Sequence, residues 1–226
     1  MTGSFVSPAM RDRVRGFATP IATGLGRLGL TPNALTLIGF LGTCLGAWAA
    51  ASQLWLLAGV LVLAFGIFDL FDGTLARATG QATKLGAFLD STFDRAGEAI
   101  VYVGIAIGLV GTGVAGTELF APAAMAAAFL VSYTRAKSEA LGFTSGTGMA
   151  AVGLMPREVR LVVLTVGLVL AGVLGSDPNP TNAAGGAGGA GFPPGVLALE
   201  LVLGVIAVGA LFTTVQRIRH VMAQAG

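Results

Sequence analysis

The chain has 226 residues, of which 54% are hydrophobic and only 11% are charged, and its mean hydropathy is +0.84. Long apolar runs with few charges are typical of polytopic membrane proteins, so this composition excludes an ordinary soluble domain. The formal net charge is +2. The basic residues do not gather with aromatic residues into a stacking surface, which argues against nucleic acid as a partner.

The N-terminal segment combines arginines with apolar residues at helical spacing. Val14, Phe17, Ile21, Leu25 and Leu28 alternate there with basic side chains. This pattern predicts an amphipathic helix over residues 8–30 that lies in the membrane interface and ends at Thr31 and Pro32. Anchorage to anionic lipid and a lid over a neighbouring site are both compatible with it.

Six apolar stretches follow, each near the roughly 20 residues that a membrane-spanning helix needs. They cover residues 33–51, 54–77, 86–111, 119–141, 157–175 and 195–216. The Gly/Ala/Pro-rich segment 176–195 predicts a solvated outer loop. We therefore expect one all-α integral membrane domain over residues 1–226, with a six-helix bundle over 33–219.

The positive charges follow membrane topology. All 13 Lys and Arg residues lie at the N-terminus, in the second-to-third turn, in the fourth-to-fifth turn or at the C-terminus. Cytoplasmic loops of membrane proteins carry an excess of such residues. The sequence thus predicts that both termini and the acidic segment 69–94 face the cytoplasm, as expected for a multi-pass protein of the inner cell membrane.

Four of the 11 acidic residues fall in the segment 69–94. On a helix, Asp69 and Asp72 share an arc of roughly 100° with Gly73 and Ala76. Gly86, Asp90, Asp94 and Gly97 repeat the arrangement within about 80° on the next helix. Each helix therefore offers carboxylates beside empty space.

Four neighbouring carboxylates close to hydrocarbon cannot all stay ionised without compensation. Two interpretations are open. The acids pair with Arg77, Lys84 and Arg95 in a solvated turn, or they hold hard divalent cations, Mg²⁺ or Mn²⁺, whose preferred ligands are oxygen atoms. A pair of ions would suit phosphoryl chemistry, and glycine would then admit a bulky phosphorylated ligand.

The spacing resembles the signature D-x2-D-G-x2-A-R-x8-G-x3-D-x3-D of the CDP-alcohol phosphotransferases. The eight fixed positions are occupied by Asp69, Asp72, Gly73, Ala76, Arg77, Gly86, Asp90 and Asp94. The resemblance implies six transmembrane helices, an N-terminal interfacial helix, two divalent metal ions and a homodimer. It also implies that a CDP-linked lipid, CDP-diacylglycerol, is the donor and that CMP leaves.

The resemblance also assigns roles to residues. Asp69, Asp72 and Asp90 would bind the metal ions, with Asp94 at their edge as general base. The CDP moiety would lie against Asp69, Gly73, Ala76, Arg77, Thr83 and Gly86.

The acceptor alcohol depends on the remaining cytoplasmic cations. Ser132, Arg135 and Lys137 lie near the end of one predicted helix, and Arg157 and Arg160 lie about 60° apart on the next. Guanidinium groups bind phosphate through two hydrogen bonds, so these residues are candidates for binding a phosphorylated acceptor. They resemble the acceptor pocket of bacterial phosphatidylinositol-phosphate synthases, which implies inositol 1-phosphate (also numbered 3-phosphate).

Other interpretations remain at this stage. The same cations would serve glycerol 3-phosphate in a phosphatidylglycerol-phosphate synthase, or merely set topology and touch lipid headgroups. A divalent-cation transporter would also need intramembrane acids, but it would distribute them across the membrane depth. Glu200, in the outer half of the last span, has no role in any of these schemes.

Overall fold

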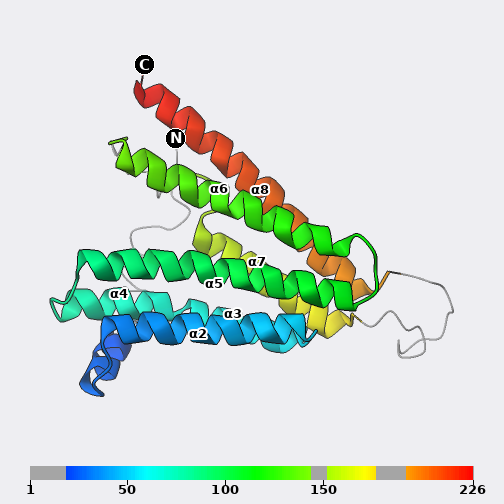
Figure 1. Ribbon diagram of the computed structural model, residues 1–226, viewed down its shortest axis with the longest axis horizontal. Coiled ribbons are helices and arrows are strands. Elements are labelled where there is room, and N and C mark those ends of the chain that lie inside the picture. Colours follow the sequence, from blue (N-terminus) through cyan, green and yellow to red (C-terminus); the bar gives the residue numbers. More distant parts are fainter. Residues whose placement is uncertain (1–18, 144–151, 177–191, 226) are drawn as a thin grey trace.

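A computed structural model describes residues 19–143, 152–176 and 192–225, apart from the side chains of Asp69 and Leu70. In this part of the chain the regular structure is entirely helical (Figure 1). The elements are α2 (Pro32–Ala51), α3 (Trp55–Gly66), α4 (Phe68–Ala78), α5 (Lys84–Gly111), the short 3₁₀ helix η1 (Thr117–Leu119), α6 (Phe120–Ala140), α7 (Arg157–Leu174) and α8 (Pro194–Ala225). Residues 19–27 are helical as well.

Four helical stretches are long and apolar enough to cross a membrane: Pro32–Ala51, Trp55–Ala78, Thr117–Ala140 and Pro194–Ala225. The other two long helices are α5 with 28 residues and α7 with 18, and their last charged residues are Glu98 and Arg160, so the remainder of each helix is uncharged. Large apolar side chains such as Leu41, Val103 and Val208 are exposed on the outside of the bundle, as expected of a surface that contacts lipid. The protein is therefore an all-α, multi-pass membrane protein.

The second apolar stretch differs from the single helix expected over residues 54–77. It is interrupted at Ile67, so that α3 ends at Gly66 and α4 begins at Phe68. Gly66 lies against α7, where an added Cβ would come within 2.7 Å of a Leu161 methyl group. Glycine has a low helix propensity and irregularities in helices often occur at it. The interruption directly precedes the acidic motif on α4.

Helix α2 is the centre of one half of the bundle. It packs against α3, α4 and α5, whereas α7 links α3 to α8, and α8 packs against α6. In Figure 1, α6 and α8 diverge from α4 and α5 toward the left end. The two acid-bearing helices α4 and α5 thus share α2 as a common support.

Small residues let these helices approach closely. A Cβ at Gly104 of α5 would collide with the carbonyl oxygen of Ala47 on α2, and one at Gly108 would collide with that of Ala50. Close backbone approach at small residues is typical of membrane helix pairs, in which the hydrophobic effect gives no preference for helix contact over lipid contact.

The N-terminal helical segment is held on the same half. Ala22 is fully buried and forms an apolar cluster with Leu35 of α2 and with Phe71 and Leu75 of α4. The Thr31 hydroxyl then caps α2 by accepting a hydrogen bond from the Ala34 amide at 3.2 Å, and Pro32 occupies the first helical turn. Residues 8–18 of the predicted interfacial helix and most of the predicted outer loop, 177–191, lie outside the described residues.

The Gly104 contact can be tested by thermal unfolding in detergent. Gly104→Ala should destabilise the protein by about 1–3 kcal/mol, because the obstructing atom is backbone and cannot rotate away. Gly204→Ala is the matched control, since no atom lies within 4 Å of the position of its Cβ. Equal melting temperatures for the two variants would contradict the close packing of α2 and α5.

Candidate active site

A cleft lies between α4 and α5, at the end of the bundle where these helices are joined by residues 79–83. It is lined by Pro32, Asn33, Thr36, Asp72, Gly73, Ala76, Arg77, Gln81, Ala82, Thr83, Gly86, Ala87 and Asp90. The cleft has a volume of about 190 Å³ and is open to the surface. It brings together two of the predicted metal ligands and nearly all of the residues predicted to contact CDP.

The residues with little or no side chain create this space. Thr83 is the N-cap of α5, where its hydroxyl accepts a hydrogen bond from the Gly86 amide at 2.9 Å. A Cβ at Gly86 would lie 3.1 Å from the Thr83 hydroxyl oxygen and 3.4 Å from Asn33 Oδ1. A larger residue at position 86 would therefore crowd the cleft.

Asp72 is supported from α2. Its side chain is buried, with 3% of the residue exposed, and its Oδ2 accepts a hydrogen bond from the Thr36 hydroxyl at 2.5 Å. Because Thr36 occupies the second turn of α2, this bond fixes the acidic face of α4 relative to α2. Asp90 is half-buried on the opposite wall of the cleft, on α5.

Asp94 lies one helical turn further along α5 and lines a second, adjoining pocket. Thr36 is common to both. The second pocket is lined by Thr36, Gly39, Phe40, Thr43, Val62, Gly66, Phe93, Asp94, Gly97, Glu98, Val101, Tyr102, Arg157, Arg160, Leu161 and Leu164. Asp94 Oδ1 lies 2.9 Å from Arg157 Nη2, and Asp94 Oδ2 lies 3.6 Å from Arg95 Nη2. The arginines thus compensate its charge.

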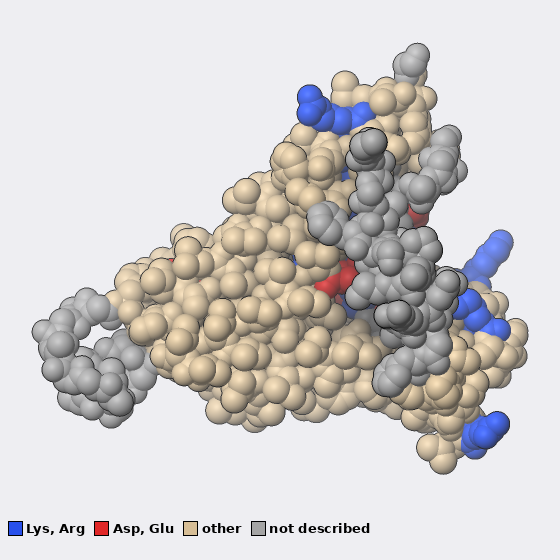
Figure 2. All heavy atoms as spheres, turned by 180° about the vertical axis from the view of Figure 1, so that it is seen from behind, with Lys and Arg blue, Asp and Glu red and all other residues tan. Residues whose placement is uncertain are grey.

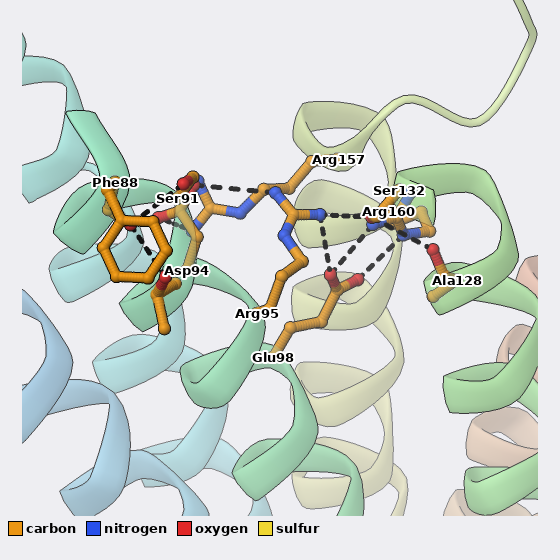
Figure 3. Close-up of polar contacts among 10 residues, drawn as sticks. Phe88, Ser91, Asp94, Arg95, Glu98, Ala128, Ser132, Arg157 and Arg160 are labelled. Carbon is orange, nitrogen blue, oxygen red and sulfur yellow. Dashed lines mark hydrogen bonds and ion pairs between the residues drawn. The ribbon is translucent and has the colours of Figure 1, made fainter. Parts of the chain in front are cut away.

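Behind Asp94 lies a second carboxylate, Glu98, which binds Arg160 through both oxygens (Figure 3). The Nε–Oε1 and Nη2–Oε2 distances are 2.8 and 2.9 Å, and only 1% of Arg160 is exposed. Glu98 also lies 3.6 Å from Arg95, whose Nη1 donates to the Ser132 hydroxyl on α6 at 2.5 Å. This network of hydrogen bonds and ion pairs connects α5 to both α6 and α7.

The five predicted acceptor-binding residues do not form one cluster. Arg157 and Arg160 line the pocket beside Asp94, and Ser132 reaches it indirectly through Arg95. Arg135 is exposed and forms an ion pair with Glu139 at 2.9 Å on its own helix. Lys137 instead lines an apolar groove between α6 and α8. The opposite directions of Arg135 and Lys137 follow from their separation by two positions on a helix.

Most of the charged groups gather at one end of the molecule, whereas Glu118 and Glu200 lie toward the opposite end. On the face in Figure 2, Lys and Arg atoms lie at the right-hand end and on the upper arm, and acidic atoms are visible in a recess between them. Among the residues that the structure describes, no group of three or more His, Cys, Asp and Glu side chains is arranged to hold a metal ion. The predicted set includes Asp69, whose side chain is not among them.

Two functional candidates were missed by the sequence analysis. Glu98 follows Asp94 at the same four-residue spacing that separates Gly86, Asp90 and Asp94, so the helical stripe on α5 would have identified it. Thr36 gives no such signal, because its partner Asp72 lies 36 residues away.

Residues 29–174 match the family model of the CDP-alcohol phosphatidyltransferases. The chain belongs to this family. The match includes both walls of the cleft and the pocket beside Asp94, and it extends to the end of α7.

Curated relatives support the assignment. Archaetidylinositol phosphate synthase of Pyrococcus horikoshii is 37% identical over 158 residues, which cover 70% of this chain and 79% of the relative. Phosphatidylinositol phosphate synthase of Streptomyces avermitilis is 34% identical over 205 residues, which cover 88% of this chain and 75% of the relative.

The fold is similar to that of Mycobacterium tuberculosis phosphatidylinositol phosphate synthase. The crystal structure of that enzyme with CDP-DAG bound matches with a TM-score of 0.71 at 28% identity, covering 90% of this chain and 92% of that chain. The same enzyme in complex with manganese and citrate matches with a TM-score of 0.71 at 27% identity, over 91% and 88% of the two chains.

The bond between Thr36 and Asp72 is testable by near-isosteric replacement. Thr36→Val removes the hydroxyl donor from a buried carboxylate, which should lower the free energy of unfolding by about 1–3 kcal/mol. Thr43→Val on the same helix is the control, because the Thr43 hydroxyl donates only within α2, to the Gly39 carbonyl. Thermal unfolding in detergent measures both. Equal melting temperatures for Thr36→Val and Thr43→Val would show that the hydrogen bond from Thr36 does not stabilise Asp72.

Proposed function

We propose that this protein transfers a phosphatidyl group from CDP-diacylglycerol to a hydroxyl of inositol 1-phosphate (3-phosphate), forming phosphatidylinositol phosphate and releasing CMP. One observation carries the proposal: the motif residues of α4 and α5 line one cleft, and that cleft adjoins a pocket in which Asp94 contacts arginine. The relatives act as phosphatidylinositol or archaetidylinositol phosphate synthases, which supports inositol phosphate as the acceptor.

The cleft fits the headgroup of the donor. Gly73, Ala76 and Gly86 leave room for a nucleotide, Thr83 holds the Gly86 turn in position, and Arg77 provides a cation at the rim for the diphosphate. Asp69 completes this proposed CDP-binding set. A bulky ligand can approach the α4 and α5 backbones only because these positions lack large side chains.

The carboxylates suit divalent cations. Asp72 and Asp90 offer oxygen ligands from opposite walls of the cleft, and this donor type matches Mg²⁺ and Mn²⁺. We propose that Asp69, Asp72, Asp90 and Asp94 hold two such ions, and the manganese complex of the Mycobacterium tuberculosis enzyme supports this assignment. Bound there, the ions would neutralise the diphosphate and stabilise the leaving CMP.

Asp94 is the proposed general base. It stands at the boundary of the two pockets, where an acceptor hydroxyl can face the phosphorus of the donor lipid. Its carboxylate would take the hydroxyl proton as that oxygen attacks. The phosphorus–oxygen bond to CMP then breaks, and the new phosphodiester remains in the lipid.

Arg157 is the principal candidate for binding the acceptor phosphate. Its side chain is 27% exposed and lines the pocket beside Asp94, so a phosphate and the base would be close together. Ser132, Arg135 and Lys137 remain candidates for outer contacts with the acceptor. Arg160 is buried, and we expect it to hold the acceptor pocket in shape rather than to contact the phosphate directly.

The proposed topology has six membrane spans, with α5 and α7 added to the four most apolar stretches. Both termini and the cleft would face the cytoplasm across an inner cell membrane, because the basic residues flank that end. We further propose one domain over residues 1–226 that comprises an interfacial helix (8–30), the bundle (33–219) and an outer loop (176–195), and that forms homodimers as the family resemblance implies.

Glycerol 3-phosphate is the second candidate acceptor, since it too carries a phosphate for Arg157. The transporter interpretation receives less support, because the acids gather at one end of the bundle. A direct assay separates these alternatives: purified protein is given CDP-diacylglycerol, Mg²⁺ or Mn²⁺, and either inositol phosphate, inositol or glycerol 3-phosphate, and CMP is measured. We expect CMP release with inositol phosphate and its loss with EDTA. Release only with glycerol 3-phosphate would overturn the proposed acceptor.

Removal of the proposed base should separate chemistry from binding. Asp94→Asn should lower the rate of CMP release by at least about 100-fold, because a positioned general base contributes about 10²–10⁴-fold. CDP-diacylglycerol binding should be largely retained. Glu118→Gln, near the opposite end of α5, controls for replacing an acid by an amide. A rate within tenfold of wild type for Asp94→Asn would exclude Asp94 as the base.

Of the two KM values, Arg157→Ala should raise the one for the acceptor. Loss of a charge-assisted contact to phosphate is expected to raise the KM for inositol phosphate about 10-fold or more, with little change in the KM for CDP-diacylglycerol. Arg219→Ala removes an exposed arginine from the end of α8 and should change neither constant. An unaltered acceptor KM in Arg157→Ala would refute the assignment.

A further inference from the structure

We propose that Glu98 is a positioning residue for the acceptor side of the site, acting through Arg160 on Arg157. The inference rests on the proposed function, because it concerns how the acceptor pocket of that function is held. Neither Glu98 nor its pairing belongs to the eight positions of the acidic motif. The side chain is oriented toward α7, away from the cleft between α4 and α5 (Figure 3).

The pair fixes the first turn of α7. Arg160 presents Nε and Nη2 to the two oxygens of Glu98, the planar arrangement in which a guanidinium binds a carboxylate most specifically. Its Nη1 donates to the Met155 carbonyl at 3.0 Å, just before α7 begins. Arg157 lies between these two anchored points, one helical turn from Arg160.

The segment before α7 is held from the other side by α8. The Met155 amide donates to the Thr213 hydroxyl at 2.9 Å, and Arg217 donates to the carbonyls of Val152 and Val131. With Glu98 in place, the start of α7 is therefore fixed between α5 and α8. Without it, the α8 contacts and the Asp94–Arg157 ion pair remain, but the two-hydrogen-bond contact that holds Arg160 to α5 is lost.

Glu98 also keeps Arg160 away from Asp94. Both arginines of α7 line the same pocket, and Arg160 lies on the same helical face as Arg157. An Arg160 side chain that lost its carboxylate would still need a buried counter-charge, and Asp94 is the next acid along α5. Glu98 thus leaves Arg157 as the α7 arginine that faces Asp94 and the incoming acceptor.

Stability alone does not account for this ion pair. Replacing a buried ion pair by apolar side chains of similar volume is often neutral or stabilising, whereas removing one partner is strongly destabilising. The double variant Glu98→Leu/Arg160→Met therefore separates the two roles. It removes the charges together and keeps the volume, but it no longer orients α7 by a directional contact.

The experiment compares wild type, Glu98→Gln, Glu98→Asp, Arg160→Met and the double variant, with Glu118→Gln as the matched control. Melting temperature in detergent, KM for CDP-diacylglycerol and KM for inositol phosphate are measured for each. We expect both Glu98→Gln and Arg160→Met to melt at lower temperature and the double variant to melt close to wild type. The acceptor KM should nevertheless be raised about 10-fold or more in the double variant, with the donor KM within twofold.

A double variant with wild-type melting temperature and wild-type acceptor KM would overturn the inference, as would equal increases in both KM values. If the double variant does not fold, Glu98→Asp decides, because its shorter side chain keeps the charge but misplaces it. A selective rise in its acceptor KM supports positioning, and an unchanged value refutes it. If wild type releases CMP only with glycerol 3-phosphate, the proposed acceptor fails, and the same comparison of KM values is made with glycerol 3-phosphate.

Discussion

The support that α2 gives to both acid-bearing helices is the constraint on which the rest of the structure depends. Glycines on α5 allow its backbone to approach the carbonyl oxygens of α2, and Thr36 of α2 holds the buried Asp72 of α4. Because α2 fixes both neighbours, the acidic faces of α4 and α5 can border an open cleft without collapsing onto each other. Carboxylates close to hydrocarbon are costly unless they have polar partners, and the Thr36 hydroxyl supplies such a partner to Asp72.

The remaining buried charges are placed so that each meets a defined partner. Glu98 and Arg160 bind each other through two hydrogen bonds, and Arg217 of α8 donates to backbone carbonyls on α6 and before α7. These contacts join helices that otherwise meet mainly through apolar side chains. Directional polar contacts therefore set the relative positions of α5, α7 and α8 near the site, while close packing at Gly104 and Gly108 holds α5 against α2 further along the helix.

Much of this arrangement could be predicted from the sequence because it depends on local patterns. Hydropathy located the helices to within a few residues except at Ile67 and at the end of α8, which continues to Ala225 rather than ending near residue 216. Helical periodicity placed Gly73 and Gly86 on the faces that border the cleft. Long-range contacts could not be predicted in this way. The pairing of Thr36 with Asp72, and of Glu98 with Arg160 across 62 residues, depends on which helices become neighbours. Helix geometry accounts for the separation of Arg135 from Lys137, but it does not predict which groove Lys137 lines.

The shared residue Thr36 gives the two pockets a functional relation. The proposed donor cleft is lined by Asp90 and the proposed acceptor pocket by Asp94, and a single helical turn of α5 separates these carboxylates. In the proposed reaction, the lipid phosphorus and the acceptor hydroxyl would therefore approach from opposite sides of one turn, and neither substrate would need to pass through the site of the other. Such an arrangement favours direct attack by the acceptor over a route through a phosphatidyl-enzyme, because the proposed base Asp94 lies 2.9 Å from Arg157, the residue proposed to bind the acceptor phosphate, so the acceptor would be held beside the base.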